Sequence, residues 1–133
     1  MATIPGSGMK ITLWVLQVLL AAFFAMVGYS HALMPFEQIA PQATWMYAVP
    51  RWLSLFIGYA EIAGGLGLII PAATRIAPWL TPLAALGLAT IMILAIPFHV
   101  LKGEASVIWM HALIGALAVF VAWGRWRRPP SRQ

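Results

Sequence analysis

The sequence predicts an all-α membrane protein, an antiparallel bundle of four transmembrane helices with an amphipathic outer loop between the first two. Of the 133 residues, 62% are hydrophobic and only 8% are charged. The mean hydropathy of +0.89 is typical of integral membrane proteins and exceeds that of soluble domains. Four apolar stretches are each long enough to cross a hydrocarbon core of ~30 Å at a rise of ~1.5 Å per residue. The length allows a single membrane domain, residues 1–133.

The four expected helices cover about residues 11–31, 52–70, 78–98 and 106–123. The first is too long for the apolar region of a signal peptide, which has ~7 to 15 residues, and is expected to be retained. The connection between the first and second helices is long and apolar, and we expect it to lie along the membrane over the outer mouth of the bundle. Pro97 predicts a kink or break near the end of the third helix. Residues 124–133 are expected to form a basic cytoplasmic tail.

The distribution of basic residues predicts the orientation. An even number of helices places both termini on one side of the membrane. Lys10, Arg75 and four arginines from position 125 onward lie on that side, whereas only Arg51 and Lys102 lie on the other. The positive-inside rule therefore predicts cytoplasmic termini in a bacterial-type inner (plasma) membrane. An arginine run directly after a membrane helix is more simply an anchor for anionic lipid than a nucleic-acid site, so the bilayer is the expected partner.

The chain contains no cysteine. Disulfides, cysteine-ligated iron–sulfur or zinc centres and dithiol electron transfer by this chain are therefore excluded. A four-helix reductase of the vitamin K epoxide type, which depends on such thiols, is excluded with them.

Glu61 is the strongest candidate for a functional residue, because it is a lone carboxylate within the apolar run of residues 53–70. An ionisable group at that depth costs at least ~2.5 kcal/mol, and such groups usually face a bundle interior or a wet cavity. Spacings of three and four place Ser54, Gly58 and Gly65 on the same helix face, where another helix could approach closely. Glu61 is therefore expected to point inward.

Polar and small residues also share one face on the first and fourth helices. We expect these faces to line the bundle interior, with the polar groups clustered in its outer half and Glu61 meeting His111 directly or through water. The candidate residues for ligand binding or proton exchange are Glu61, His111, His31, His99, Tyr59 and Gln17. The glycines expected at helix contacts are Gly28, Gly58, Gly64, Gly65 and Gly115.

Two functional interpretations of Glu61 remain open. A carboxyl beside an imidazole is suited to proton exchange with a bound quinone or similar small amphiphile. Alternatively, Glu61 is only a clamp that hydrogen-bonds across helices. Bis-histidine ligation of haem by His31 and His99 is disfavoured, because helix-end histidines ordinarily reach toward headgroups and water. The histidines and carboxylates show no recognisable spacing for a metal site.

The order of these features resembles that of the DoxX-like family of small four-helix membrane proteins. The resemblance covers residues 10–126 and is most specific in the segment Gly-x-x-Glu-x-x-Gly-Gly-x-Gly-Leu at residues 58–68. It also includes Gly28-Tyr29-Ser30-His31, Pro50-Arg51-Trp52 and residues 95–104. The family commonly has lysine where this chain has His31, so a role that needs a permanent cation is not expected at that position.

The resemblance implies a function linked to quinones. Some relatives are subunits of thiosulfate:quinone oxidoreductase, and others accompany quinone or catechol detoxification. Our leading hypothesis is an accessory membrane protein of such a system that binds a quinone-like molecule near Glu61 and His111. It has no covalent cofactor or redox centre and is not expected to act as an enzyme alone, so electrons would come from a membrane or peripheral partner protein. A structural or assembly subunit is the alternative, a small-solute transporter is the third hypothesis, and Gly and Ala faces could support a homo-oligomer.

Overall fold

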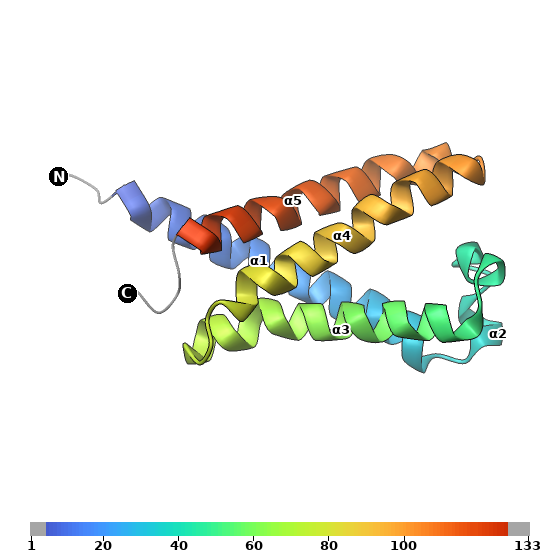
Figure 1. Cartoon of the computed structure of the whole chain (residues 1–133), viewed down its shortest axis with the longest axis horizontal. Helices are drawn as coiled ribbons and strands as arrows, with labels where there is room; N and C mark the ends of the chain where they lie inside the picture. The colour runs from blue at the N-terminus through green and yellow to red at the C-terminus, as the bar shows by residue number, and fades with distance from the viewer. Residues whose placement is uncertain (1–4, 128–133) are drawn as a thin grey trace.

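The computed structural model describes residues 5–127, and four long helices dominate it (Figure 1). They are α1 (Pro5–Leu33), α3 (Arg51–Thr74), α4 (Leu80–Leu101) and α5 (Ile108–Arg127). A short helix, α2 (Phe36–Ile39), and a 3₁₀ turn, η1 (Thr44–Ala48), lie between α1 and α3, and a second 3₁₀ turn, η2 (Ala105–Val107), precedes α5.

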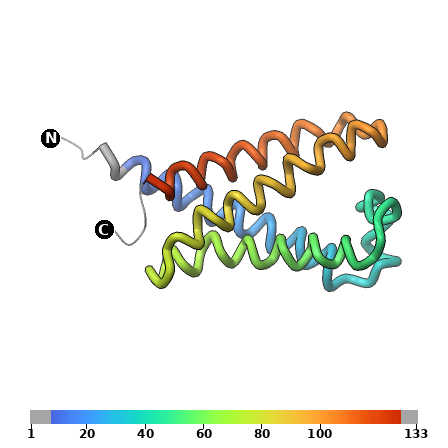
Figure 2. Tube along the Cα trace, viewed as in Figure 1, coloured from blue at the N-terminus to red at the C-terminus, as the bar shows by residue number. Residues whose placement is uncertain are grey.

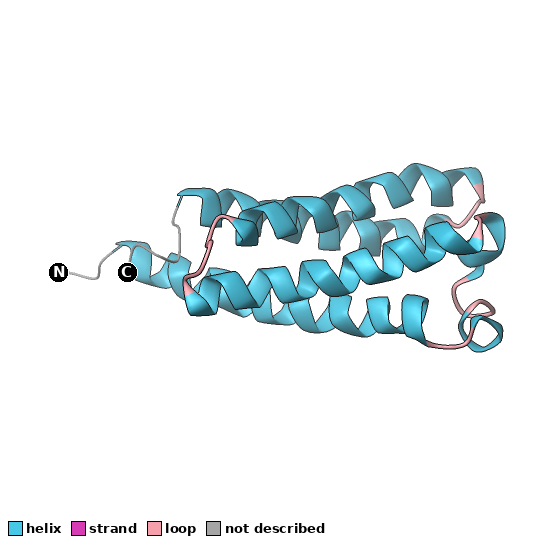
Figure 3. Cartoon of the chain, turned by 60° about the horizontal axis from the view of Figure 1, so that its bottom comes forward, coloured by secondary structure: helices cyan, strands magenta, loops and turns pink. Residues whose placement is uncertain are grey.

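Four helical stretches are long and apolar enough to cross a membrane: Gly8–Leu33, Arg51–Thr74, Leu80–Leu101 and Ala105–Arg127, the last of which includes η2. The predicted all-α, four-span architecture is therefore confirmed. Successive long helices run in opposite directions (Figure 3). The connections from α3 to α4 and from α4 to α5 are short, whereas the one from α1 to α3 is long and contains α2 and η1. We call the end where α1 begins and α5 finishes the terminal end, and the end that carries α2, η1 and η2 the loop end.

The helix bounds differ from the expected ones at several positions, and α3 runs through Pro71 to Thr74 rather than ending at residue 70. The first helix starts at Pro5 rather than near residue 11, because proline is well tolerated in a first turn, where its missing N–H has no intrahelical acceptor. The third spanning helix continues past Pro97 to Leu101 without the expected break, since a proline this close to the helix end deprives only the carbonyl of Ile93 of its donor. Residues 124–127 belong to α5 rather than to a basic tail, and residues 128–133 lie outside the described part.

Glycines allow α1 to pack closely against α3. A Cβ atom added at Gly28 would lie 2.6 Å from the backbone oxygen of Gly58, and one added at Gly58 would lie 2.8 Å from the backbone nitrogen of Ala32. A Cβ at Gly65 would lie 3.1 Å from the backbone oxygen of Ala21. Close backbone approach through glycine is the usual route to tight helix pairs in lipid, where helices gain little hydrophobic energy from associating.

The helices α3 and α4 touch closely in their terminal halves. Cβ atoms added at Gly64 and Gly67 would collide with side-chain atoms of Leu88 and Ala84 at 2.5 and 2.7 Å. Pro71 has no N–H, so it leaves the carbonyl of Gly67 without its helical donor. The hydroxyl of Thr81 donates to that carbonyl at 3.0 Å, which satisfies it from the neighbouring helix, as hydrocarbon surroundings require.

The helix pair α4–α5 diverges from the pair α1–α3 toward the loop end (Figure 2). Figure 2 shows α4 and α5 running together and separating from α1 and α3 as they leave the terminal end. The main core lies where all four helices still meet, and it is centred on the fully buried Phe24, Leu68, Ala85, Ala118 and Val121. A small separate cluster of Ile39, Ala40 and Met46 holds the α2–η1 segment together at the loop end.

We predict that Gly28→Ala destabilises the protein. The new methyl group would overlap backbone atoms of α3, which cannot rotate away, and overpacking of this kind typically costs ~1 to 3 kcal/mol. Gly87→Ala is the matched control, because a Cβ there meets nothing within 4 Å and alanine favours helix. Thermal unfolding in detergent should show a lower melting temperature for Gly28→Ala only. Equal melting temperatures would mean that α1 and α3 do not pack through Gly28.

Candidate functional site

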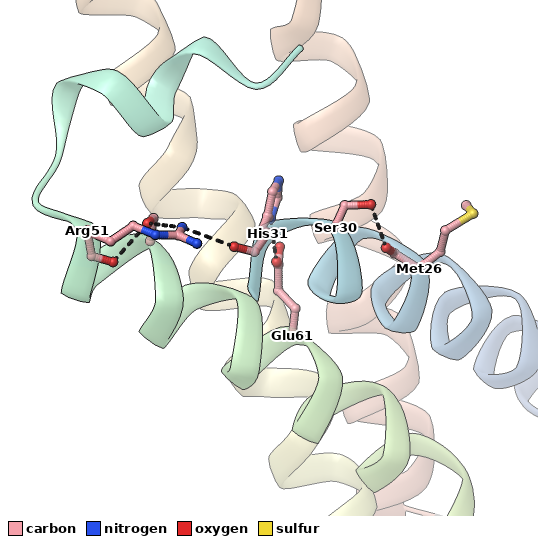
Figure 4. A network of polar contacts seen from close by, with 6 residues as sticks. Met26, Ser30, His31, Arg51 and Glu61 are labelled. Carbon is pink, nitrogen blue, oxygen red and sulfur yellow. Dashed lines mark hydrogen bonds and ion pairs between the residues drawn. The ribbon is translucent and has the colours of Figure 1, made fainter. Parts of the chain in front are cut away.

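Glu61 is 2% exposed and points inward from α3, in a row of buried residues that includes Ser54, Gly58 and Gly65. Its carboxylate oxygen Oε1 lies 2.8 Å from Nδ1 of His31 near the end of α1, and the side chain of His31 is only 12% exposed (Figure 4). The pair forms because the Gly28–Gly58 contact brings the backbones of α1 and α3 together one turn away. Glu61 therefore contacts His31 rather than the expected His111.

Two further contacts hold His31 in place. The indole ring of Trp45 meets the imidazole edge to face, with centroids 5.0 Å apart. Nη1 of Arg51 donates to the backbone oxygen of His31 at 3.4 Å and to the hydroxyl of Ser54 at 3.1 Å (Figure 4). Arg51 thus ties the C-terminal end of α1 to the first turn of α3, where a basic side chain also complements the helix dipole of α1.

Two adjoining hollows occupy the space opened by the divergence of the helices. The lateral hollow, about 370 Å³, lies between the loop-end halves of α3 and α4. The loop-end hollow, about 570 Å³, lies among α1, α4, α5 and the η1 segment. Six residues line both hollows: His31, Trp45, Glu61, Met92, His99 and His111. The two hollows therefore form one chamber, which contains the carboxylate of Glu61 and all three histidines of the chain.

The two remaining histidines lie close together on the α4–α5 side of the chamber. The rings of His99 and His111 are 4.6 Å apart between centroids. Nδ1 of His111 lies 2.9 Å from the backbone oxygen of Val107, and a carbonyl can only accept, so Nδ1 carries the hydrogen. In neutral His111 the other ring nitrogen, Nε2, is therefore an acceptor.

Glu104 links His99 to the segment that covers the loop end. Its Oε1 lies 2.7 Å from Nδ1 of His99, and its Oε2 accepts from the hydroxyl of Thr44 at 3.1 Å. Lys102 donates to the backbone oxygen of Thr44 at 3.4 Å. We call these contacts the loop latch. The hydrogen bond from His99 is the main cause that lowers the pKa of Glu104 below its ordinary value of 4.5, against an opposing effect of desolvation.

Two of the residues expected at the site lie elsewhere. Tyr59 is 52% exposed on the outer surface of α3 and does not line the chamber. Gln17 is fully buried, but in the terminal half, where its Nε2 donates to the backbone oxygen of Leu68 at 2.6 Å. Its Oε1 accepts from Nε of Arg125 at 2.5 Å. Gln17 therefore joins α1, α3 and α5 and takes no part in the chamber.

Sequence reasoning missed the burial of Arg125, which is only 1% exposed and stacks over the ring of Trp14. The signal was present, because Arg125 continues the inward-facing row of Gly115, Ala118 and Ala122 at helical spacing. It also missed Glu104, which lies five positions after His99 and reaches it across the turn. Trp45, which packs on His31, was also not among the candidate residues.

The remaining expected positions have clear structural surroundings. At each of the five glycines expected at helix contacts, an added Cβ would lie within 3.3 Å of an atom of a neighbouring helix: Gly28, Gly58, Gly64, Gly65 and Gly115. Among residues 5–127, no group of three or more histidine or acidic side chains is arranged to hold a metal ion. His31 and His99, the pair considered for haem, each direct Nδ1 to a carboxylate.

We predict that Glu104→Gln lowers the melting temperature by a few degrees at pH 7, with a difference that shrinks in acid. Because the folded-state pKa of Glu104 is depressed, its contribution to stability is complete above pH ~4.5 and is lost as the pH falls through the lower folded value. Melting curves between pH 7 and pH 3 would measure this. Glu37→Gln, an exposed position on α2, serves as the control and should match the wild type throughout. A difference that persists undiminished at pH 3 would contradict the assignment.

Comparison with known proteins supplies a family but no individual relative. The chain matches the profile of the DoxX-like family over residues 15–121, which includes Glu61, all three histidines and Glu104. No curated protein and no solved structure gives a significant match. Because the family match covers most of the 133 residues and the four apolar helices agree with it, the chain is an integral membrane protein that belongs to the DoxX-like family.

Proposed function

We propose that the protein binds a quinone-like small hydrophobic molecule in the chamber and acts as an accessory protein of a quinone-linked redox or detoxification system. The observation that carries the proposal is the convergence of Glu61 and three histidines on a chamber that is otherwise lined largely by apolar side chains. A few polar groups in a mostly apolar cavity of ~300 to 1,000 Å³ are the usual design of a small-molecule site.

The His31–Glu61 pair suits the carbonyl oxygen of a quinone. A buried pair in a low dielectric costs least when it is electrically neutral overall. A neutral pair is either a carboxylic acid donating to a neutral imidazole or a carboxylate accepting from an imidazolium. In both forms Nε2 of His31 carries a hydrogen and can donate to a carbonyl oxygen. The pair therefore offers a donor to the oxidised ligand.

Loss of one proton reverses this preference. When a carboxylate of Glu61 accepts from neutral His31, Nε2 has a free lone pair and can only accept. Such a pair matches the hydroxyl of a quinol, as does the acceptor nitrogen of neutral His111. Proton transfer between the pair and the ligand would thus accompany a change in the ligand's redox state, while the electrons come from a partner protein.

Buried polar contacts outside the chamber favour a structural or assembly subunit as the second candidate function. The Gln17 and Arg125 side chains join three helices in the terminal half and line no part of the chamber. Such contacts fix helix register without any ligand. Transporter sites are typically formed by helices that are broken near the middle of the membrane. Within residues 5–127, none of the four spanning helices is broken in this way, so the transporter hypothesis gains no support.

We expect both termini to lie on the cytoplasmic side of a bacterial-type inner membrane. The terminal end carries Lys10, Arg75 and the arginines of α5, whereas the loop end carries Arg51 and Lys102. The chamber would then face the outer half of the bilayer. Reporter fusions after Gln133 and beside Gln42 provide the test, and a reporter at Gln133 that is active only outside the cytoplasm would refute this orientation.

We predict that Glu61→Gln keeps the protein folded but removes the pH dependence of quinone binding. Glutamine preserves the shape and a hydrogen bond to His31, but it cannot release a proton. Wild-type affinity for a decyl-substituted benzoquinone, measured from pH 5.5 to 8.5, should be higher when the pair carries its extra proton, because only that form donates to the carbonyl oxygen. His31→Phe, which removes Nε2, should lose at least ~10-fold in affinity, equivalent to about 1.4 kcal/mol. Calorimetric titration of the purified protein in detergent would measure these constants.

Glu37→Gln is the control for this series, because Glu37 is exposed on α2 and lines neither hollow. It should bind the quinone as the wild type does. Wild-type binding by both Glu61→Gln and His31→Phe at every pH would reduce the pair to a structural clamp and favour the assembly subunit. Solvent extraction of the purified wild-type protein, followed by absorbance spectroscopy, would show whether it already carries a quinone.

A further inference from the structure

The two hollows of the chamber differ in chemistry. Beyond the six residues that line both, the lateral hollow is surrounded almost entirely by apolar side chains of α3 and α4. The loop-end hollow adds polar groups, among them Gln42, Thr44, Glu104 and Ser106. A molecule that fills both hollows would therefore meet polar partners at one end and hydrocarbon-like walls at the other.

The lateral hollow opens between α3 and α4 at the level of Glu61 and above it toward the loop end. In the terminal half, Gly64 and Gly67 let the two helices touch. Toward the loop end, the α3 side of the hollow is formed by Phe56 and Ile57, which are bulky, and the helices stand apart (Figure 2). Phe56 and Leu94 line this hollow and are 65% and 66% exposed, so they also face the surroundings of the bundle.

In a membrane-spanning bundle, those surroundings are lipid acyl chains. The opening between α3 and α4 therefore connects the chamber to the hydrocarbon core of the bilayer without passing the loop latch. An apolar chain can lie in this opening at little cost, because it exchanges lipid contacts for contacts with Phe56, Leu94 and Ala95. A polar head group could not stay there, since it would lack hydrogen-bond partners.

We propose that the ligand is a long-tailed amphiphile whose polar ring lies in the chamber and whose apolar tail leaves between α3 and α4 into the lipid. This inference rests on the proposed function and adds the class of quinone and its route. The helix pair α3–α4 would thus act as a lateral portal that selects tailed over tailless quinones, and Ala95 would be the residue that keeps the portal open.

The first test compares two ligands with the same benzoquinone ring, one tailless and one bearing a decyl chain. After correction for detergent partitioning, the wild type should bind the decyl compound at least ~10-fold more tightly. Ala95→Phe, which fills the portal, should abolish that difference by weakening binding of the decyl compound at least ~10-fold more than binding of the tailless one. Ala116→Phe on the exposed face of α5 is the matched control and should retain the wild-type preference.

The second test needs no variant and uses the same ring with a photoreactive diazirine at the end of its tail. Mass spectrometry after irradiation should find adducts on α3 and α4 near Phe56 and Leu94. Adducts confined to α1 and α5, near Phe23 and Ile114, would place the tail on the opposite side and overturn the portal. Equal wild-type affinity for both compounds would overturn it as well and leave the proposed function intact, whereas binding of neither compound would refute the proposed function itself.

Discussion

A carboxyl group placed about three turns inside a membrane helix is stable there only if another buried group satisfies it. Glu61 is in this position, and His31 is its partner. Breaking a buried ion pair typically costs ~3 to 5 kcal/mol, because the remaining charge has no water to solvate it. This requirement fixes the register of α1 against α3. Gly28 and Gly58 make this pairing possible. They let the two backbones approach closely enough for the side chains of His31 and Glu61 to touch.

The shape of the bundle follows from where its glycines lie. One pair of helices is held together close to the loop end by Gly28 and Gly58, and α3 is held to α4 only in the terminal half by Gly64 and Gly67. The divergence of the two helix pairs is the result, and the chamber occupies the space between them. The tight contact between α1 and α3 holds His31 and Glu61 in place. The wider separation of α3 and α4 toward the loop end leaves the cavity that these two residues line.

Much of this fold could be predicted from the sequence, because membrane spans depend on composition and length alone. The inward direction of Glu61 was also predictable from the small residues on its helix face. Its partner was not, because His31 and His111 both lie on inward faces, and the choice depends on which helices pack in contact. The burial of Arg125 was overlooked for another reason, because an arginine run after a membrane helix resembles a solvated tail. The helical spacing of the buried residues of α5 nevertheless places Arg125 on the inward face. The chamber could not be predicted, because it depends on how far apart neighbouring helices lie, and the residue pattern of one helix does not determine that distance.

The segment that covers the loop end packs around a small core that is separate from the core of the helices beneath it. Its own core is the cluster of Ile39, Ala40 and Met46, and the latch that joins it to the α4–α5 turn consists of hydrogen bonds from the side chains of Thr44 and Lys102. Segments with a core of their own typically open as separate cooperative units, and we expect this one to open locally while the bundle stays folded. Opening of this kind changes how fast molecules enter and leave without changing the contacts of the bound state. Variation at positions of this segment that line neither hollow, such as Ile39 and Met46, would therefore alter the residence time of a ligand more than its equilibrium affinity.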